Sequence, residues 1–156
     1  MSEKFSVKEV VEQAVRAEQL GYRFYTEMAE RFRENARLHD LFATLAGKEL
    51  IHERNFKELH DCVGDAEPEG WEDVSEYMRA FVESEFFLGS GKALTSMERI
   101  RTPAEAVNFA IGFEKETLLY FLGVRDAVKQ REIVDEIINE ERSHVMWLNR
   151  FKERFL

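Results

Sequence analysis

The sequence predicts an all-α protein, a single domain of residues 1–156 built as a bundle of four long helices. The chain contains only two prolines and eight glycines, and residue types that favour helix dominate it. Apolar residues also recur in four segments at alternating steps of four and three, the spacing that keeps one helix face toward its neighbours. The length suits one domain that buries most of its apolar surface and is short for two.

The first two helices form a predicted hairpin. Ser6 and Glu9 match a capping box, so a first helix is expected to begin there. It should run to a polar break at 34–36, after which a second helix continues to Gly64. The break is short, and the two helices are therefore expected to be antiparallel neighbours.

An irregular segment, Asp65 to Arg101, follows the second helix, with a short helical piece expected near Val74 to Phe87. It is far longer than the usual connection between helices and can run the length of a bundle. The third helix can then run parallel to the second. Aromatic residues of this segment are expected to cover the side of the bundle or a dimer interface: Trp71, Phe81, Phe86 and Phe87.

The last two helices form a second predicted hairpin. Thr102, Pro103 and Glu105 combine a capping Thr, a proline at the first helical position and a reciprocal Glu. The third helix should begin there and end near Asp126. A weaker start signal at 127–129 opens a fourth helix whose apolar period runs to Phe155.

Polar residues interrupt each apolar seam once, near its middle: Glu18 in the first helix, Glu49 and His52 in the second, Glu114 in the third, Glu141 and His144 in the fourth. The two interruptions of each hairpin are equally distant from the turn. Because facing residues of an antiparallel hairpin share that property, the interruptions should meet at one height. The Glu-x-x-His pair of the second helix also recurs in the fourth, 92 residues later.

Four carboxylates inside a bundle require positive charge, since an unpaired buried carboxylate costs several kcal/mol. No Lys or Arg occupies the seams near them, whereas two divalent cations would balance them and accept both imidazoles as ligands. One Glu from each of two helices and a Glu-x-x-His from each of the other two is typical of ferritin-like di-metal proteins. The sequence therefore predicts a two-metal site, with a metal-free polar network as the alternative.

Four segments resemble the rubrerythrin branch of the ferritin-like superfamily, and the likeness covers nearly the whole chain: AEQLGYRFY (17–25), KELIHE (48–53), AIGFEKETLLYF (110–121) and EERSH (140–144). The resemblance implies a ferritin-like four-helix bundle with a long crossover between helices 2 and 3. It implies two iron ions as cofactor, which zinc or manganese could replace in a purified sample. It further implies roles for six residues: Glu49 and Glu141 bridge the metals, Glu18 and Glu114 are terminal ligands, and His52 and His144 each complete one metal.

Two departures from rubrerythrin proper stand out. Its rubredoxin domain needs several cysteines, and this chain has only Cys62. The family's extra carboxylate, three residues beyond Glu114, is replaced by Thr117, and Glu116 points about 200° away around the helix axis. The chain is more similar to the short, single-domain rubrerythrin-like proteins.

Small and aromatic residues lie near the predicted ligands. Tyr25, two turns after Glu18, could hydrogen-bond a ligand or carry a radical, or simply pack. Gly21, Gly47 and Gly112 each lie within a turn of a ligand, where they could make room for helices and metals or be placed by chance.

The charge balance restricts the partners. The formal net charge of −9 repels nucleic acid and anionic lipid, and no apolar run has the length of a signal peptide core or a membrane span. We expect a cytoplasmic homodimer or higher homo-oligomer. The leading hypothesis is a di-iron redox protein that reacts with dioxygen or hydrogen peroxide and takes electrons from an external donor. The alternatives are a ferroxidase or iron-handling protein and a metal-stabilised structural bundle, so whether the protein is an enzyme stays open.

Overall fold

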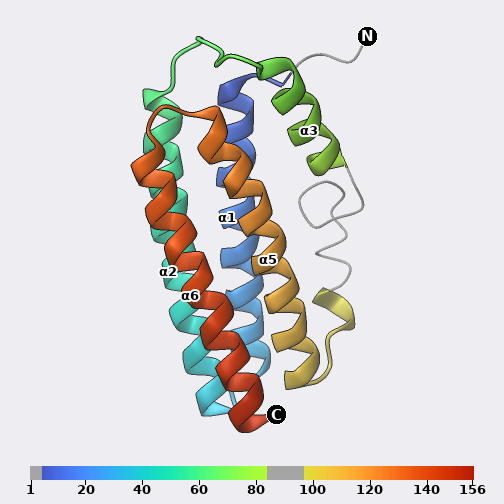
Figure 1. Ribbon diagram of the computed structural model, residues 1–156. Helices are drawn as coiled ribbons and strands as arrows, with labels where there is room; N and C mark the ends of the chain where they lie inside the picture. Colours follow the sequence, from blue (N-terminus) through green and yellow to red (C-terminus); the bar gives the residue numbers. More distant parts are fainter. Residues whose placement is uncertain (1–4, 84–96) are drawn as a thin grey trace.

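Four long helices lie side by side and form the body of the molecule (Figure 1). The computed structural model describes residues 5–83 and 97–156, and this part of the chain contains helices and no strands. The long helices are α1 (Val7–Arg31), α2 (Ala36–Cys62), α5 (Pro103–Ala127) and α6 (Arg131–Phe155). The predicted all-α bundle is therefore confirmed. None of the described helices is both long and apolar enough to cross a membrane.

The first hairpin follows the predicted signals. Ser6 Oγ accepts from Glu9 N at 3.0 Å, and Glu9 Oε1 accepts from Ser6 N at 3.3 Å, so the capping box is formed. Asn35 caps α2 by accepting from Leu38 N at 3.2 Å. Residues 32–35 form the turn between α1 and α2, close to the predicted break. At its other end α2 stops two residues before Gly64.

The second hairpin differs from the prediction in its caps. Thr102 Oγ1 accepts from Glu105 N at 3.2 Å, as predicted, but the Glu105 carboxylate accepts from the Thr102 hydroxyl at 3.0 Å and not from its backbone N–H. Helix α6 begins at Arg131, later than the predicted 127–129. Its N-cap, Gln130, makes no side-chain hydrogen bond, which explains why the start signal in the sequence is weak.

The crossover returns the chain to the end where α2 began, so α2 and α5 run in the same direction (Figure 1). Within it α3 (Trp71–Glu83) packs on α5. The helical piece begins before the predicted Val74, and the remainder of its predicted range, with Phe86 and Phe87, lies outside the described residues. The Trp71 indole N–H donates to the Phe5 carbonyl at 2.9 Å, and the Phe81 ring lies 5.7 Å from that of Tyr120. These two aromatics cover the side of the bundle, as predicted.

The apolar core is divided into two clusters along the bundle. One surrounds Val10, Phe56 and Phe121, and the other surrounds Phe24 and Leu148. The buried polar residues of the four seams lie between the two clusters. Apolar side chains therefore close the site from both ends.

The four-and-three spacing of apolar residues predicts inward-facing side chains at Ile111 and Leu118 in the third helix and at Phe155 in the fourth, and all three are less buried than this spacing predicts. Phe155 is 43 % exposed at the end of α6, where the Arg37 guanidinium lies 4.6 Å from its ring centroid. Ile111 and Leu118 are only partly buried. Helix α5 packs on α3 as well as on the bundle. Its buried face therefore includes residues beside the predicted seam, such as Tyr120.

Candidate metal centre

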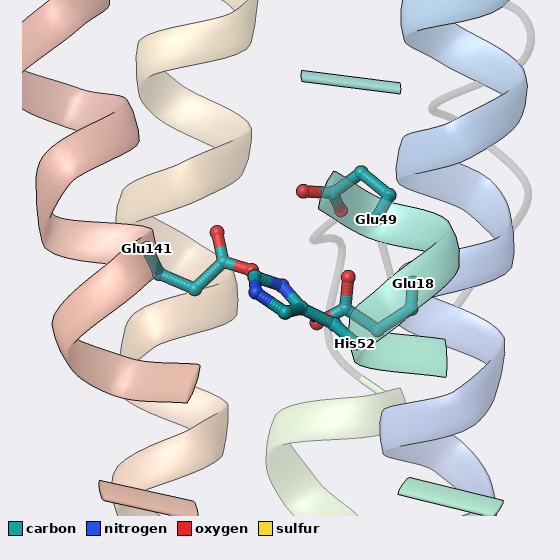
Figure 2. A group of neighbouring side chains, drawn as sticks. All are labelled: Glu18, Glu49, His52 and Glu141. Carbon is teal, nitrogen blue, oxygen red and sulfur yellow. The ribbon is translucent and has the colours of Figure 1, made fainter. Parts of the chain in front are cut away.

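All six predicted ligands meet in the middle of the bundle, and each side chain is at most 1 % exposed: Glu18 from α1, Glu49 and His52 from α2, Glu114 from α5, and Glu141 and His144 from α6. Figure 2 shows four of them converging in the space between the helices, with the imidazole of His52 between the carboxylates of Glu18 and Glu141. The structure thus brings together every residue in the predicted ligand set.

The six residues form two overlapping groups, and within each group one potential ligand atom per residue lies within 4.8 Å of the others. The first group is Glu18, Glu49, His52 and Glu141, and the second is Glu49, Glu114, Glu141 and His144. Glu49 and Glu141 belong to both. A carboxylate that bridges two metal ions must belong to the ligand groups of both, and Glu49 and Glu141 meet this condition.

Both imidazoles turn Nδ1 toward the carboxylates. His52 Nδ1 lies 2.8 Å from Glu141 Oε1 and 3.6 Å from Glu18 Oε1. His144 Nδ1 lies 3.1 Å from Glu141 Oε2, 3.4 Å from Glu114 Oε1 and 3.5 Å from Glu49 Oε1. The two rings stack with centroids 5.6 Å apart. Nδ1 is therefore the nitrogen that a metal between the carboxylates would meet.

Among the described residues, Tyr25 and Glu140 form hydrogen bonds to the ligand set from outside. The Tyr25 hydroxyl donates to Glu114 Oε1 at 2.5 Å, which is the ligand contact considered from the sequence. His52 Nε2 donates to Glu140 Oε2 at 2.9 Å, a contact that the sequence reasoning missed. The sequence carries no local signal for this contact, because Glu140 lies outside the apolar seam of its helix and its partner is 88 residues away along the chain.

Gly21 gives the cluster room on α1. A Cβ at this position would lie 2.3 Å from Glu49 Oε2 and 3.2 Å from Phe113 Cε1. At Gly47 and Gly112 an added Cβ would meet nothing within 4 Å. Of the three glycines noted in the sequence, only Gly21 lies where an added Cβ would displace a predicted ligand.

Burial and mutual repulsion disturb the carboxylates. Burial, together with the charge of Glu141, raises the pKa of Glu114 to about 8. Burial and neighbouring carboxylates also raise the pKa values of Glu18 and Glu49 well above the usual range. Burial acts on Glu141 too, but hydrogen bonds from Glu114, His144 and His52 outweigh it and hold its pKa below the usual range.

The pKa values of both imidazoles are raised as well, although burial alone would lower them. Burial lowers the pKa of His52, but its hydrogen bond to Glu141 and the nearby carboxylates outweigh burial and raise the pKa to about 9. By the same balance, with Glu114 as hydrogen-bond partner, the pKa of His144 rises to about 10. Protons therefore supply the positive charge in the metal-free cluster, and metal ions would have to displace them.

The donor set fits a pair of metal ions. Several buried atoms have no hydrogen-bond partner in the described part of the chain: both carboxylate oxygens of Glu18, Glu49 Oε1, Glu114 Oε2 and His144 Nε2. Four of these five are acceptor oxygens, which a cation would satisfy. Carboxylate oxygens with imidazole nitrogens suit iron, manganese or zinc. That the six residues bind metal stays a prediction, and the geometry is compatible with it.

Comparison with known proteins agrees with this site. The sequence profile of the rubrerythrin family matches residues 9–102, which is more than half of the chain. The chain belongs to the rubrerythrin family. A crystal structure from Thermotoga maritima, of a protein named as a candidate ferritin-like diiron-carboxylate protein, has a similar fold with a TM-score of 0.74 and 26% sequence identity. The similarity covers 100% of both chains. Among curated proteins none matches.

Membership of the rubrerythrin family, together with the buried carboxylate and histidine cluster, supports a metal-binding protein of the di-iron type. The chain departs from the pattern of rubrerythrin proper at the positions that the sequence indicated. The Thr117 hydroxyl donates to the Phe113 carbonyl at 2.8 Å, within its own helix. Glu116 is buried but belongs to neither ligand group. Cys62 is exposed at the end of α2.

Proposed function

We propose that this protein is a non-haem di-iron redox protein. Glu18, Glu49, His52, Glu114, Glu141 and His144 would hold two iron ions, and dioxygen or hydrogen peroxide would be the substrate of the reduced centre. Two ferrous ions would together supply the two electrons that, with two protons, convert hydrogen peroxide into two waters or dioxygen into hydrogen peroxide.

The sharing of Glu49 and Glu141 between the two ligand groups carries this proposal. A structural metal ion needs one closed set of four ligands. Here each group supplies four residues, and two of the four belong to both groups, so the two ions would lie close together. An ion that accepts more than four ligands would then keep a coordination position for a small oxidant. Closely paired ions suit a reaction that requires two electrons at one place.

The surroundings of the cluster favour a small substrate. The six side chains are at most 1 % exposed, and apolar clusters close both ends of the site. The cavity of about 620 Å³ at the end of the bundle is lined by residues such as Val63 and Val128 and by none of the six. Dioxygen and hydrogen peroxide are small enough to pass through transient gaps, whereas a larger organic substrate would require the helices to separate.

The protein's own groups prepare the site. Glu49 and Glu141 would balance positive charge on both ions. The apolar clusters exclude bulk water, and this strengthens every electrostatic interaction inside the site. The Tyr25 hydroxyl donates to Glu114 Oε1, so Glu114 Oε2, which has no hydrogen-bond partner within the described residues, would be the oxygen that meets a metal. Residues 1–156 contain a single cysteine, which is exposed, so these residues cannot form a rubredoxin iron site and electrons would come from a redox centre outside them.

Stopped-flow absorbance tests the proposal. Protein loaded with two ferrous ions per chain without oxygen is mixed with dioxygen or hydrogen peroxide, and the near-ultraviolet charge-transfer absorption is followed. We expect oxidation of both ions in one turnover, and a second turnover only after a reductant is added. The Glu49→Ala variant should lose the reaction, while Glu136→Gln, on the exposed face of α6, should retain it.

The same experiment separates the alternatives. Repeated turnover on added ferrous ions, without a reductant, would instead identify an iron-handling protein. Absence of any reaction in protein that retains its iron would leave a structural metal centre and refute the redox proposal.

A further inference from the structure

The two metal positions have equal sets of ligands but unequal surroundings. Each position has one terminal Glu, one His and the two shared carboxylates: Glu18 and His52 on one side, Glu114 and His144 on the other. The six ligands alone therefore give no reason for the two ions to differ. The difference lies in the groups that contact the terminal ligands.

At the first position a carboxylate supports the imidazole. His52 Nε2 donates to Glu140 Oε2 at 2.9 Å, and the ammonium of Lys48 lies 3.9 Å from the same oxygen. An imidazole that donates its outer N–H to a carboxylate is held in one tautomer and orientation and becomes a more basic metal ligand. Glu140 therefore strengthens the grip of His52.

At the second position this support is missing. His144 Nε2 is buried and has no hydrogen-bond partner in the described part of the chain. Its ring packs against Trp147, with centroids 5.5 Å apart. The internal repeat of 92 residues places Lys48 at the position that corresponds to Glu140, and an ammonium cannot accept a hydrogen bond. The His144 imidazole is thus left without the partner that His52 has.

The terminal carboxylates differ in the same direction. The Tyr25 hydroxyl donates to Glu114 Oε1 at 2.5 Å, and this bond draws electron density from an oxygen that would otherwise serve a metal. Neither oxygen of Glu18 has a hydrogen-bond partner within the described residues. Both terminal ligands of the first position are therefore the stronger donors.

We propose that the two metal positions are unequal, with the ion at Glu18 and His52 bound first and more tightly and the ion at Glu114 and His144 exchangeable. The proposal rests on the di-metal centre of the proposed function and adds an order of loading to it. Weaker donors also favour the lower oxidation state of a metal. In a half-oxidised pair, the ferrous ion would be the one at Glu114 and His144.

Histidine-specific NMR resolves the two positions directly. The chain has four histidines, of which His39 and His60 lie outside the cluster and can be assigned by substitution with Gln. Metal-free protein labelled with ¹⁵N-histidine is titrated with Zn²⁺, a diamagnetic probe. We expect the Nδ1 signal of His52 to reach its metal-bound position during the first equivalent and that of His144 during the second.

Variants test the cause of the order. Glu140→Gln keeps the shape of the side chain and removes its charge, so the affinity of the first position should fall about tenfold or more and the two imidazoles should then titrate together. Tyr25→Phe should raise the affinity of the second position and leave the first unchanged. Glu136→Gln, one turn earlier on α6 and exposed, is the matched control and should keep the wild-type order.

The outcomes separate this proposal from the metal centre itself. Simultaneous ligation of both imidazoles in the wild type, or earlier ligation of His144, would overturn the unequal positions and leave the di-metal centre intact. An unchanged order in Glu140→Gln would overturn the role of Glu140 as a positioning residue. Ligation of neither imidazole would contradict the di-metal centre.

Discussion

Gly21→Ala is expected to remove metal binding while the fold persists. The added Cβ would lie 2.3 Å from Glu49 Oε2, and contacts closer than 3.0 Å are essentially not seen for real Cβ atoms. The carboxylate must therefore move by about 0.7 Å or more, and Phe113 Cε1, at 3.2 Å from the new methyl group, limits where the methyl can go. Metal sites tolerate errors of about 0.5 Å. A displaced shared ligand should lower the affinity for both ions.

The matched controls are Gly47→Ala and Gly112→Ala. Both residues are exposed in helices, and an added Cβ would meet nothing within 4 Å. Ala is favoured over Gly inside a helix by about 1 kcal/mol, so each control should raise the melting temperature of the metal-free protein by about 2–4 °C. Each should also keep two metals per chain. In Gly21→Ala the helix gain is offset by the close contact.

Elemental analysis after reconstitution with iron, together with circular dichroism, measures both effects. We expect Gly21→Ala to show the helical spectrum of the wild type and to retain less than half of its iron, while both controls retain all of it. Full metal content in Gly21→Ala would refute the reasoning, because Glu49 would then have another position from which to bind both ions.

Three further predictions concern the same cluster. Replacing a shared carboxylate, Glu49 or Glu141, by Ala should remove both ions in elemental analysis. Replacing a terminal carboxylate, Glu18 or Glu114, should remove at most one, since water can take the place of a terminal ligand; equal loss in all four variants would contradict the bridging roles. Tyr25→Phe should lower the free energy of unfolding in urea by about 1–3 kcal/mol, because Glu114 loses its hydroxyl donor. Chelation should lower the melting temperature, since a hundredfold excess of metal over the dissociation constant of one position stabilises the fold by about 2.7 kcal/mol, or about 5–10 °C. Burial and the charge of Glu141 raise the pKa of Glu114 to about 8 from its usual 4.5, so the metal-free fold binds more protons than the unfolded chain between these values and loses stability as pH rises through them. The difference between chelated and metal-loaded protein should therefore widen from pH 5 to pH 8, and a constant difference would contradict this linkage.

Much of the site could be predicted because it interrupts a regular pattern. Glu18, Glu49, Glu114 and Glu141 stand in apolar seams, and the register of each hairpin places its two carboxylates at a common height. Gly21 could also have been separated from Gly47 and Gly112, because it alone stands in an inward seam.

Other features depend on contacts that no local pattern encodes. Glu140 lies outside the seam of its helix, and its partner His52 is 88 residues away along the chain, so only the packing of α6 against α2 reveals the pair. The buried face of α5 likewise depends on a contact with a distant segment. Helix α3 packs against α5 near Gly123, where an added Cβ would lie within 3 Å of Met78. The apolar pattern of α5 does not indicate that α3 is a second neighbour.

The most direct test of the central claim is anomalous diffraction at the iron edge from crystals of iron-reconstituted protein. The account predicts two iron peaks per chain, both beside the shared carboxylates of Glu49 and Glu141, with one next to Nδ1 of His52 and the other next to Nδ1 of His144. A single peak, or iron located outside this cluster, would contradict a di-iron centre held by these residues.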